Sequence, residues 1–209
     1  MRFTWIRSTI LCASLAALGA VLASAQTDVA VSVYGAFNGT TTGNGTTQSP
    51  ANAAGGLIEL RHISSPLFGY EATYAFNRAN QSYSANSYAC PVGISPCNPP
   101  TPASISANAH EITGDWVVSL PLANLRPFAL AGAGLLLDEP TSGQSNTSSA
   151  TKAVFVYGAG VDWGLLPHLG LRLQYRGNLY KAPDLTSRFH STGAFLHTAE
   201  PMVGAYFRF

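Results

Sequence analysis

The segment Leu169-Gly-Leu-Arg-Leu-Gln-Tyr-Arg-Gly-Asn-Leu-Tyr180 decides the fold class. Its residues alternate between two faces, with Leu169, Leu171, Leu173, Tyr175 and Leu179 on one and Arg172, Gln174, Arg176 and Asn178 on the other. Helical spacing would scatter the arginines around a cylinder, whereas strand spacing places them on one side. The segment therefore predicts a β-strand with one apolar and one polar face.

The same alternation recurs along the chain. It predicts eight strands, at about residues 28–38, 55–64, 67–78, 107–120, 125–138, 151–165, 168–180 and 197–209. Three connections are short and contain proline, at 64–66, 121–124 and 166–167, and the others, at 39–54, 79–106, 139–150 and 181–196, are long and polar. Short turns that alternate with long loops are typical of an antiparallel up-and-down β-barrel of the bacterial outer membrane. Within the first long loop, the Gly-, Thr- and Asn-rich run 40–47 is expected to be mobile.

The composition favours a membrane protein. The chain of 209 residues is 46% hydrophobic and only 10% charged, against a typical charged share of about 25%. Its aromatic content of 11% excludes a disordered chain, and its net charge of +1 gives no basic surplus for nucleic-acid binding. After residue 25, no uncharged run reaches the roughly 18 residues of a spanning helix. A membrane location therefore requires a closed barrel, because lipid offers no hydrogen-bond partner to an open sheet edge.

The first 25 residues have the features of a secretory signal peptide. Two arginines precede an apolar run at 10–22, and the small residues Ala23-Ser24-Ala25 follow. This pattern predicts cleavage between Ala25 and Gln26, which leaves a single barrel domain at 26–209. That domain keeps two cysteines, Cys90 and Cys97, in a Pro-rich loop. In a secreted protein such a pair is most simply a local disulfide; a metal clip would need two more ligands, and a redox pair usually has C-x-x-C spacing.

Alternation alone does not say which face points inward, since a soluble barrel also alternates. Charges of both signs share one face of many strands: Glu59, Arg61, Glu71, Glu111, Asp115, Asp162, Arg172, Arg176, Glu200 and Arg208. A soluble surface usually carries many lysines, yet only Lys152 and Lys181 follow residue 25. Arginine–carboxylate pairs suit a confined interior because the guanidinium fork is bidentate. We therefore expect these charges to form a network inside the barrel.

The opposite face collects aromatic side chains: Phe68, Tyr70, Tyr74, Phe76, Trp116, Phe155, Tyr157, Trp163, Phe207 and Phe209. Such residues suit the lipid-facing band of a membrane barrel and the aromatic girdles at its two edges. An ordinary soluble sandwich is the weaker alternative, because it would expose the charged set as a nearly Lys-free surface. The aromatic face is therefore expected to contact lipid.

The chain ends on Met202-Val-Gly-Ala-Tyr-Phe-Arg-Phe209, which resembles the C-terminal signal by which the barrel-assembly machinery recognises outer-membrane proteins. Gly204, Phe207 and Phe209 match that signal, whereas Met202 occupies a position that is usually polar. With the signal peptide and the eight strands, residues 27–209 resemble a small outer-membrane β-barrel protein of the OmpA/OmpX type. The resemblance implies secretion through the periplasm to the outer membrane of a Gram-negative-type bacterium, where lipid surrounds a monomer.

The chemistry of the chain is sparse. The pairs Gly132/Gly134 and Gly158/Gly160 do not complete a dinucleotide motif, so no cofactor is expected. His190-Ser191 has the wrong spacing for a barrel deacylase, and the chain offers no evident metal or catalytic set. An eight-stranded barrel encloses little more than its own side chains, here expected to be Arg, Glu, Gln and Tyr. These features favour a non-enzymatic structural or interaction protein that presents its loops to an unidentified extracellular ligand; a narrow permeation pore or a lipid-active enzyme is the alternative.

Overall fold

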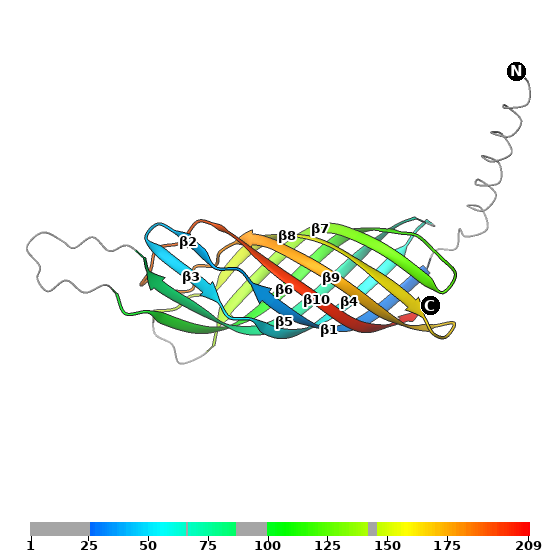
Figure 1. Ribbon diagram of the computed structural model, residues 1–209, viewed down its shortest axis with the longest axis horizontal. Coiled ribbons are helices and arrows are strands. Elements are labelled where there is room, and N and C mark those ends of the chain that lie inside the picture. Colours follow the sequence, from blue (N-terminus) through cyan, green and yellow to red (C-terminus); the bar gives the residue numbers. More distant parts are fainter. Residues whose placement is uncertain (1–25, 66, 87–99, 142–145) are drawn as a thin grey trace, which may run out of the picture.

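The computed structural model describes residues 26–65, 67–86, 100–141 and 146–209 (Figure 1). Its regular elements in these ranges are the β-strands β1 (Gln26–Asn38), β2 (Thr41–Gly43), β3 (Thr46–Pro50), β4 (Ala53–Ile63), β5 (Phe68–Ala85), β6 (Ala103–Ser119), β7 (Leu125–Pro140), β8 (Ala150–Gly164), β9 (Leu169–Lys181) and β10 (Phe195–Arg208). No helix among the described residues has the length and apolarity needed to cross a membrane.

Eight of these strands close into an antiparallel barrel, as the sequence predicts. The order along the sheet is β5-β4-β1-β10-β9-β8-β7-β6, and β6 pairs with β5 to complete the ring. The first and last barrel strands are neighbours, so that Ser32 on β1 lies opposite Gly204 on β10. Figure 1 shows an elongated barrel whose strands run obliquely along its axis. Because every barrel strand has two partners, the wall presents no open edge to lipid.

The first long loop differs from expectation. The run 40–47, predicted to be mobile, contains β2, the two-residue turn and the first two residues of β3, and β3 pairs with the outer part of β5. Asn44 and Gly45 both have positive φ, 49° and 77°, as a two-residue hairpin turn requires. β5 reaches Ala85 and β6 begins at Ala103, so this side of the sheet continues well past the predicted strand ends at 78 and 107. The extended strands give the hairpin a partner.

The outer face of the barrel is apolar. Leu171, Leu173 and Tyr175 of β9 are exposed, and so are all ten aromatic residues assigned to the lipid-facing side. One aromatic girdle surrounds the end with short turns and includes Trp116, Trp163 and Phe207; the other, toward the long loops, includes Phe76 and Phe155. This distribution fits a barrel that crosses a bilayer between two interfacial belts.

Candidate functional site

The barrel interior is built around Arg172, whose side chain is fully buried. Its Nε and Nη2 donate to the two carboxylate oxygens of Asp162, at 2.7 and 3.0 Å. Nη1 donates to Glu59 Oε2 at 3.1 Å, and Nη2 also donates to Asp28 Oδ1 at 2.9 Å. One guanidinium from β9 thus joins carboxylates from β8, β4 and β1. Charge-assisted, bidentate contacts of this kind hold their partners in a defined geometry.

Arg61 extends this network across the lumen. Its Nε donates to Glu71 Oε2 at 2.6 Å, and its Nη1 donates to Asp162 Oδ2 at 3.3 Å. β4 and β8 are not neighbours in the sheet, so the second contact bridges opposite walls. The guanidinium also lies 4.0 Å from the ring centroid of Phe128, a cation–π contact that adds to the packing. Arg61, Arg172 and Phe128 are all buried in the half of the lumen nearer the short turns, where a small polar cavity beside Asp162 and Arg208 stays open.

A second charge cluster surrounds Arg176, one inward-facing position beyond Gln174 on β9. Arg176 Nη2 lies 3.2 Å from Glu111 Oε1, and Nη1 lies 3.7 Å from Asp115 Oδ2. Its two terminal nitrogens also donate to the hydroxyls of Thr73 and Thr113 at 3.2 and 3.1 Å. These partners stand on β5 and β6, so this side chain also crosses from one wall to the other.

The structure places the ten charged residues of the predicted network as follows. Glu59, Arg61, Glu71, Glu111, Asp115, Asp162, Arg172 and Arg176 are buried and joined in ion pairs. Glu200 is buried but forms no ion pair with another described residue, and Arg208 is only half-buried, with its guanidinium 5.1 Å from the ring centroid of Tyr206. The assembly-signal residues lie on β10 and at its end, with Phe207 and Phe209 exposed and 5.3 Å apart.

Sequence reasoning missed several members of the interior. Asp28 is buried and forms an ion pair with Arg172. The sequence alternation could have placed it in the lumen, because it lies on the same inward face of β1 as Ser32 and Tyr34. Apolar side chains also enter the lumen, as Phe128, Leu130 and Val156 do, where only Arg, Glu, Gln and Tyr were expected. Ala25 and the cysteine pair Cys90 and Cys97 lie outside the described residues, and Gln26 begins β1.

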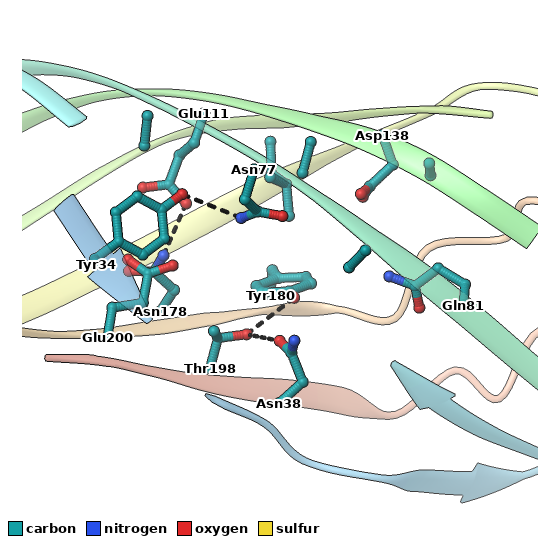
Figure 2. A pocket seen from close by; sticks show the side chains of 15 residues that line it. Tyr34, Asn38, Asn77, Gln81, Glu111, Asp138, Asn178, Tyr180, Thr198 and Glu200 are labelled. Atoms are coloured by element: carbon teal, nitrogen blue, oxygen red, sulfur yellow. Dashed lines mark hydrogen bonds between the residues drawn. The ribbon is translucent and has the colours of Figure 1, made fainter. Parts of the chain in front are cut away.

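Above Arg176, toward the long loops, lies a small polar cavity (Figure 2). Its walls include the carboxylates of Glu111, Asp138 and Glu200, which come from three different strands. Asn178 Nδ2 donates to Glu111 Oε2 at 2.8 Å, and Asn77 Nδ2 donates to the Tyr34 hydroxyl at 3.1 Å. Among the described residues, no group of three His, Cys, Asp or Glu side chains comes close enough to hold a metal ion.

The segment between β9 and β10 closes the barrel over this cavity. Tyr83 Oη donates to Pro183 O at 2.9 Å and accepts from the Leu185 backbone N–H at 3.4 Å. Leu185 is fully buried against Ile105 and Ala107. Burial raises the pKa of Tyr83, which lies beyond the outer aromatic girdle, so this hydroxyl keeps the proton that it donates. We call residues 182–194 the cap segment.

The β2–β3 hairpin fastens the other side of the cap segment. Asn44 Nδ2 donates to Ser191 O at 2.7 Å, and Gln48 Nε2 donates to Pro183 O at 3.2 Å. The hydroxyls of Thr41 and Thr192 lie 3.4 Å apart. His190 and Ser191 are both exposed on the cap segment. The β2–β3 hairpin and the cap segment thus hold each other in a folded arrangement at the outer end of the barrel.

Comparison with known proteins agrees with this architecture. The family model described as outer membrane protein beta-barrel domain matches residues 10–199. No curated protein matches the chain in sequence. Similar solved structures include Ail, the attachment invasion locus protein of Yersinia pestis, in complex with the heparin analogue sucrose octasulfate: 17% identity over 89% of this chain and 99% of Ail, with a TM-score of 0.52.

Two further structures are similar in fold. Neisserial surface protein A is 14% identical over 89% of this chain and 99% of its own, with a TM-score of 0.53. The outer membrane protein OprG from Pseudomonas aeruginosa is 9% identical over 89% of this chain and 96% of its own, with a TM-score of 0.58. At these identities the likeness shows the shared barrel fold.

Proposed function

Because this chain belongs to the outer membrane protein β-barrel domain family and resides in the Gram-negative outer membrane, we propose that it is a non-enzymatic interaction protein. In this proposal a closed barrel holds the folded outer loops in place for an extracellular partner. The observation that carries the proposal is the filled lumen. Arg61 and Arg172 join walls of the barrel that are not adjacent, which leaves little room for a solute path beside them.

The folded cap supports a binding role over a diffusion role. In a diffusion pore, a Leu185 side chain buried at the outer opening would only obstruct passage. A binding surface, in contrast, binds more tightly when its segments are already ordered. The exposed part of the cap and hairpin is rich in hydroxyl and amide groups, with Arg188 among its few charges. Such a surface suits a partner that is recognised mainly by hydrogen bonds.

The proposal extends to biogenesis. Cleavage after Ala25 would release the barrel domain, and the barrel-assembly machinery would recognise the tail through Gly204, Phe207 and Phe209. A Cys90–Cys97 disulfide would restrain the long loop between β5 and β6. The monomer is the proposed state, because each of the eight strands of the barrel wall is already paired on both sides.

Single-channel recording in planar bilayers tests the closed lumen. The folded protein should give no steady conductance, whereas a porin measured in the same bilayers provides the positive control. A stable conductance in the wild-type protein would favour the permeation alternative instead.

A capture experiment tests the binding role. The intact barrel in nanodiscs serves as bait, next to a matched variant in which residues 186–191 are replaced by Gly and Ser. The interaction proposal expects a partner that the wild-type protein captures and the variant loses. A partner retained equally by both baits would place binding elsewhere, and hydrolysis of added lipid by the wild-type protein would contradict the non-enzymatic assignment.

A further inference from the structure

A groove crosses the lipid-facing wall of the barrel where β4, β1 and β10 lie side by side (Figure 1). Its volume is about 520 Å³, and none of its lining residues, all of which belong to the described ranges, is charged. Many outward positions of the wall carry large apolar side chains, and two of them, Val33 and Val203, stand exposed at this groove. The groove is therefore a hollow in an otherwise bulky apolar surface.

Small outward-facing residues on three neighbouring strands produce the hollow. Gly35 of β1 is paired with Ala54 of β4, and the register of β1 with β10 places it opposite Pro201. Glycine has no side chain, alanine has a single methyl group, and the proline ring is compact. Tyr34 and Met202 also line the groove, although they are only 5% and 6% exposed. The groove thus reaches down to residues whose side chains belong to the barrel interior.

The strand pairing is interrupted at the same place. β1 pairs with β10 without a break as far as Tyr34–Met202, and the pairing resumes only at Phe37–Ala199. Pro201 lies in the gap and has no backbone N–H to donate across it. Proline within a sheet is largely restricted to edge strands and bulges, so its position inside a closed wall is unusual. With fewer hydrogen bonds, this part of the wall can adjust to an occupant more easily than the rest.

The position of the groove identifies its occupant. Gly56, next to the groove on β4, is paired with Phe76 of the outer aromatic girdle, so the groove lies toward the outer side of the lipid-facing wall. An unfilled hollow there would forfeit the dispersion contacts of the atoms that line it. Val33 and Val203 would hold the broad wall of a second barrel away from the floor of the groove, whereas a single acyl chain is thin enough to enter.

We propose that this groove binds one acyl chain of a lipid in the outer leaflet. The chain lies against Gly35, Ala54 and Pro201, and Val33 and Val203 flank it. Because both the chain and the groove are apolar, close packing rather than the hydrophobic effect favours the contact. This inference is independent of the loop-binding role, because the groove faces the membrane and shares no residue with the cap segment.

Photochemical cross-linking tests the proposal. The folded protein is placed in nanodiscs that hold one barrel each and contain a phosphatidylcholine with a diazirine in the middle of one acyl chain. After photolysis, mass spectrometry maps the lipid adducts. We expect adducts on Val33 and Val203 to be about threefold or more as frequent as adducts on Leu173, an exposed aliphatic residue that is paired with Val203 but lies outside the groove. Equal frequencies at the three residues would overturn the proposal.

Matched variants show whether the groove itself is responsible. Ala54→Leu fills the groove from an exposed position and should lower the adducts on Val33 and Val203 to the frequency found on Leu173. Ala153→Leu makes the same change at an exposed position of β8 and should leave the pattern unchanged. Both variants are first shown to keep the heat-modifiable migration of the folded barrel. Enrichment that persists in the folded Ala54→Leu protein would contradict the proposal.

A second copy of the chain is tested as the alternative occupant. The wild-type protein is photolysed in vesicles of the same lipid at increasing protein density. Adducts in the groove should keep their enrichment at every density, because each barrel carries its own bound chain. Their disappearance as the barrels crowd together would show that a neighbouring barrel covers the groove, which would overturn the acyl-chain assignment.

Discussion

Arg172 and Asp162 form a two-pronged ion pair in the barrel interior, with Nε–Oδ1 and Nη2–Oδ2 distances of 2.7 and 3.0 Å. The pair links neighbouring positions of β9 and β8, and the same guanidinium reaches Asp28 and Glu59. Both side chains are at most 1% exposed. A single arginine therefore contacts three carboxylates, and Arg61 supplies a second positive charge to Asp162; without such cations, carboxylates this close together in a dry space would repel one another.

Replacement of this arginine should be costly. Arg172→Leu would leave Asp28, Glu59 and Asp162 without their shared cation, and breaking a buried pair in this way typically costs about 3–5 kcal/mol. Leu173→Ile is the control, because this neighbour faces lipid and is 54% exposed. Urea unfolding in lipid vesicles compares the two variants. If Leu173→Ile proves the more damaging change, the assignment of inner and outer faces is wrong.

The closed ladder should make the folded protein resistant to detergent. Each barrel strand pairs on both sides, so sodium dodecyl sulfate without heat has no free edge at which to begin unfolding. We expect the unboiled sample to migrate differently from the boiled sample on a denaturing gel. Identical migration of the two samples would count against a stable closed barrel.

Gly204 has a packing role that is separate from the assembly signal. A Cβ at this position would lie 2.5 Å from Val31 O and still closer to Ser32 Oγ on the paired strand. Gly204→Ala should therefore destabilise the refolded barrel by roughly 1–3 kcal/mol, as overpacking does. Gly114→Ala is the matched control, since a Cβ there meets nothing within 4 Å. Urea midpoints of the two purified variants in vesicles measure the difference.

Deletion of Phe209 should leave the stability of the refolded barrel almost unchanged but impair its assembly in cells. Its side chain is 69% exposed and contributes an edge contact to Phe207, so the refolded barrel should lose little stability. If the tail acts as the assembly signal, the truncated chain should still be exported but reach the outer membrane at reduced levels. Fractionation of cells that express each form, with signal-peptide cleavage as the export control, checks this. Wild-type levels in the outer membrane would show that Phe209 is not read as a signal.

The sequence could predict the architecture because its faces alternate so regularly. On β9, Leu171 and Leu173 face lipid and Arg172 between them faces the lumen. A shift of the strand register by one residue would turn every side chain to the opposite face. The missed hairpin had a recognisable signal, because Asn44-Gly45 between threonine-rich segments is a strong indicator of a two-residue turn. The low complexity of the run, by contrast, favours a mobile loop.

The partners inside the lumen could not be predicted in the same way. Whether Arg61 contacts Asp162 depends on the tilt and stagger of strands on opposite walls, which the sequence of either strand does not specify. The same holds for the cap. Leu185 is buried only because β5 continues as far as Tyr83 and β6 begins before Ile105, and the length of those extensions is set by their pairing with each other.

The Tyr83 hydroxyl anchors the cap segment. Tyr83→Phe keeps the ring but removes the hydroxyl that donates to Pro183 O and accepts from the Leu185 N–H and Gln48 Nε2. At about 0.5–1.5 kcal/mol for each net hydrogen bond, its loss should raise the open population of the cap by roughly tenfold. Trypsin should then cleave the Tyr83→Phe protein after Arg188 faster than it cleaves wild type, as measured by mass spectrometry on protein in vesicles.

The control is Tyr70→Phe, which changes a tyrosine on the exposed outer face and should be cleaved at the wild-type rate. Because the barrel below does not depend on this hydroxyl, heat-modifiability should survive in both variants; unchanged cleavage in Tyr83→Phe would show that apolar packing of Leu185 alone holds the cap closed.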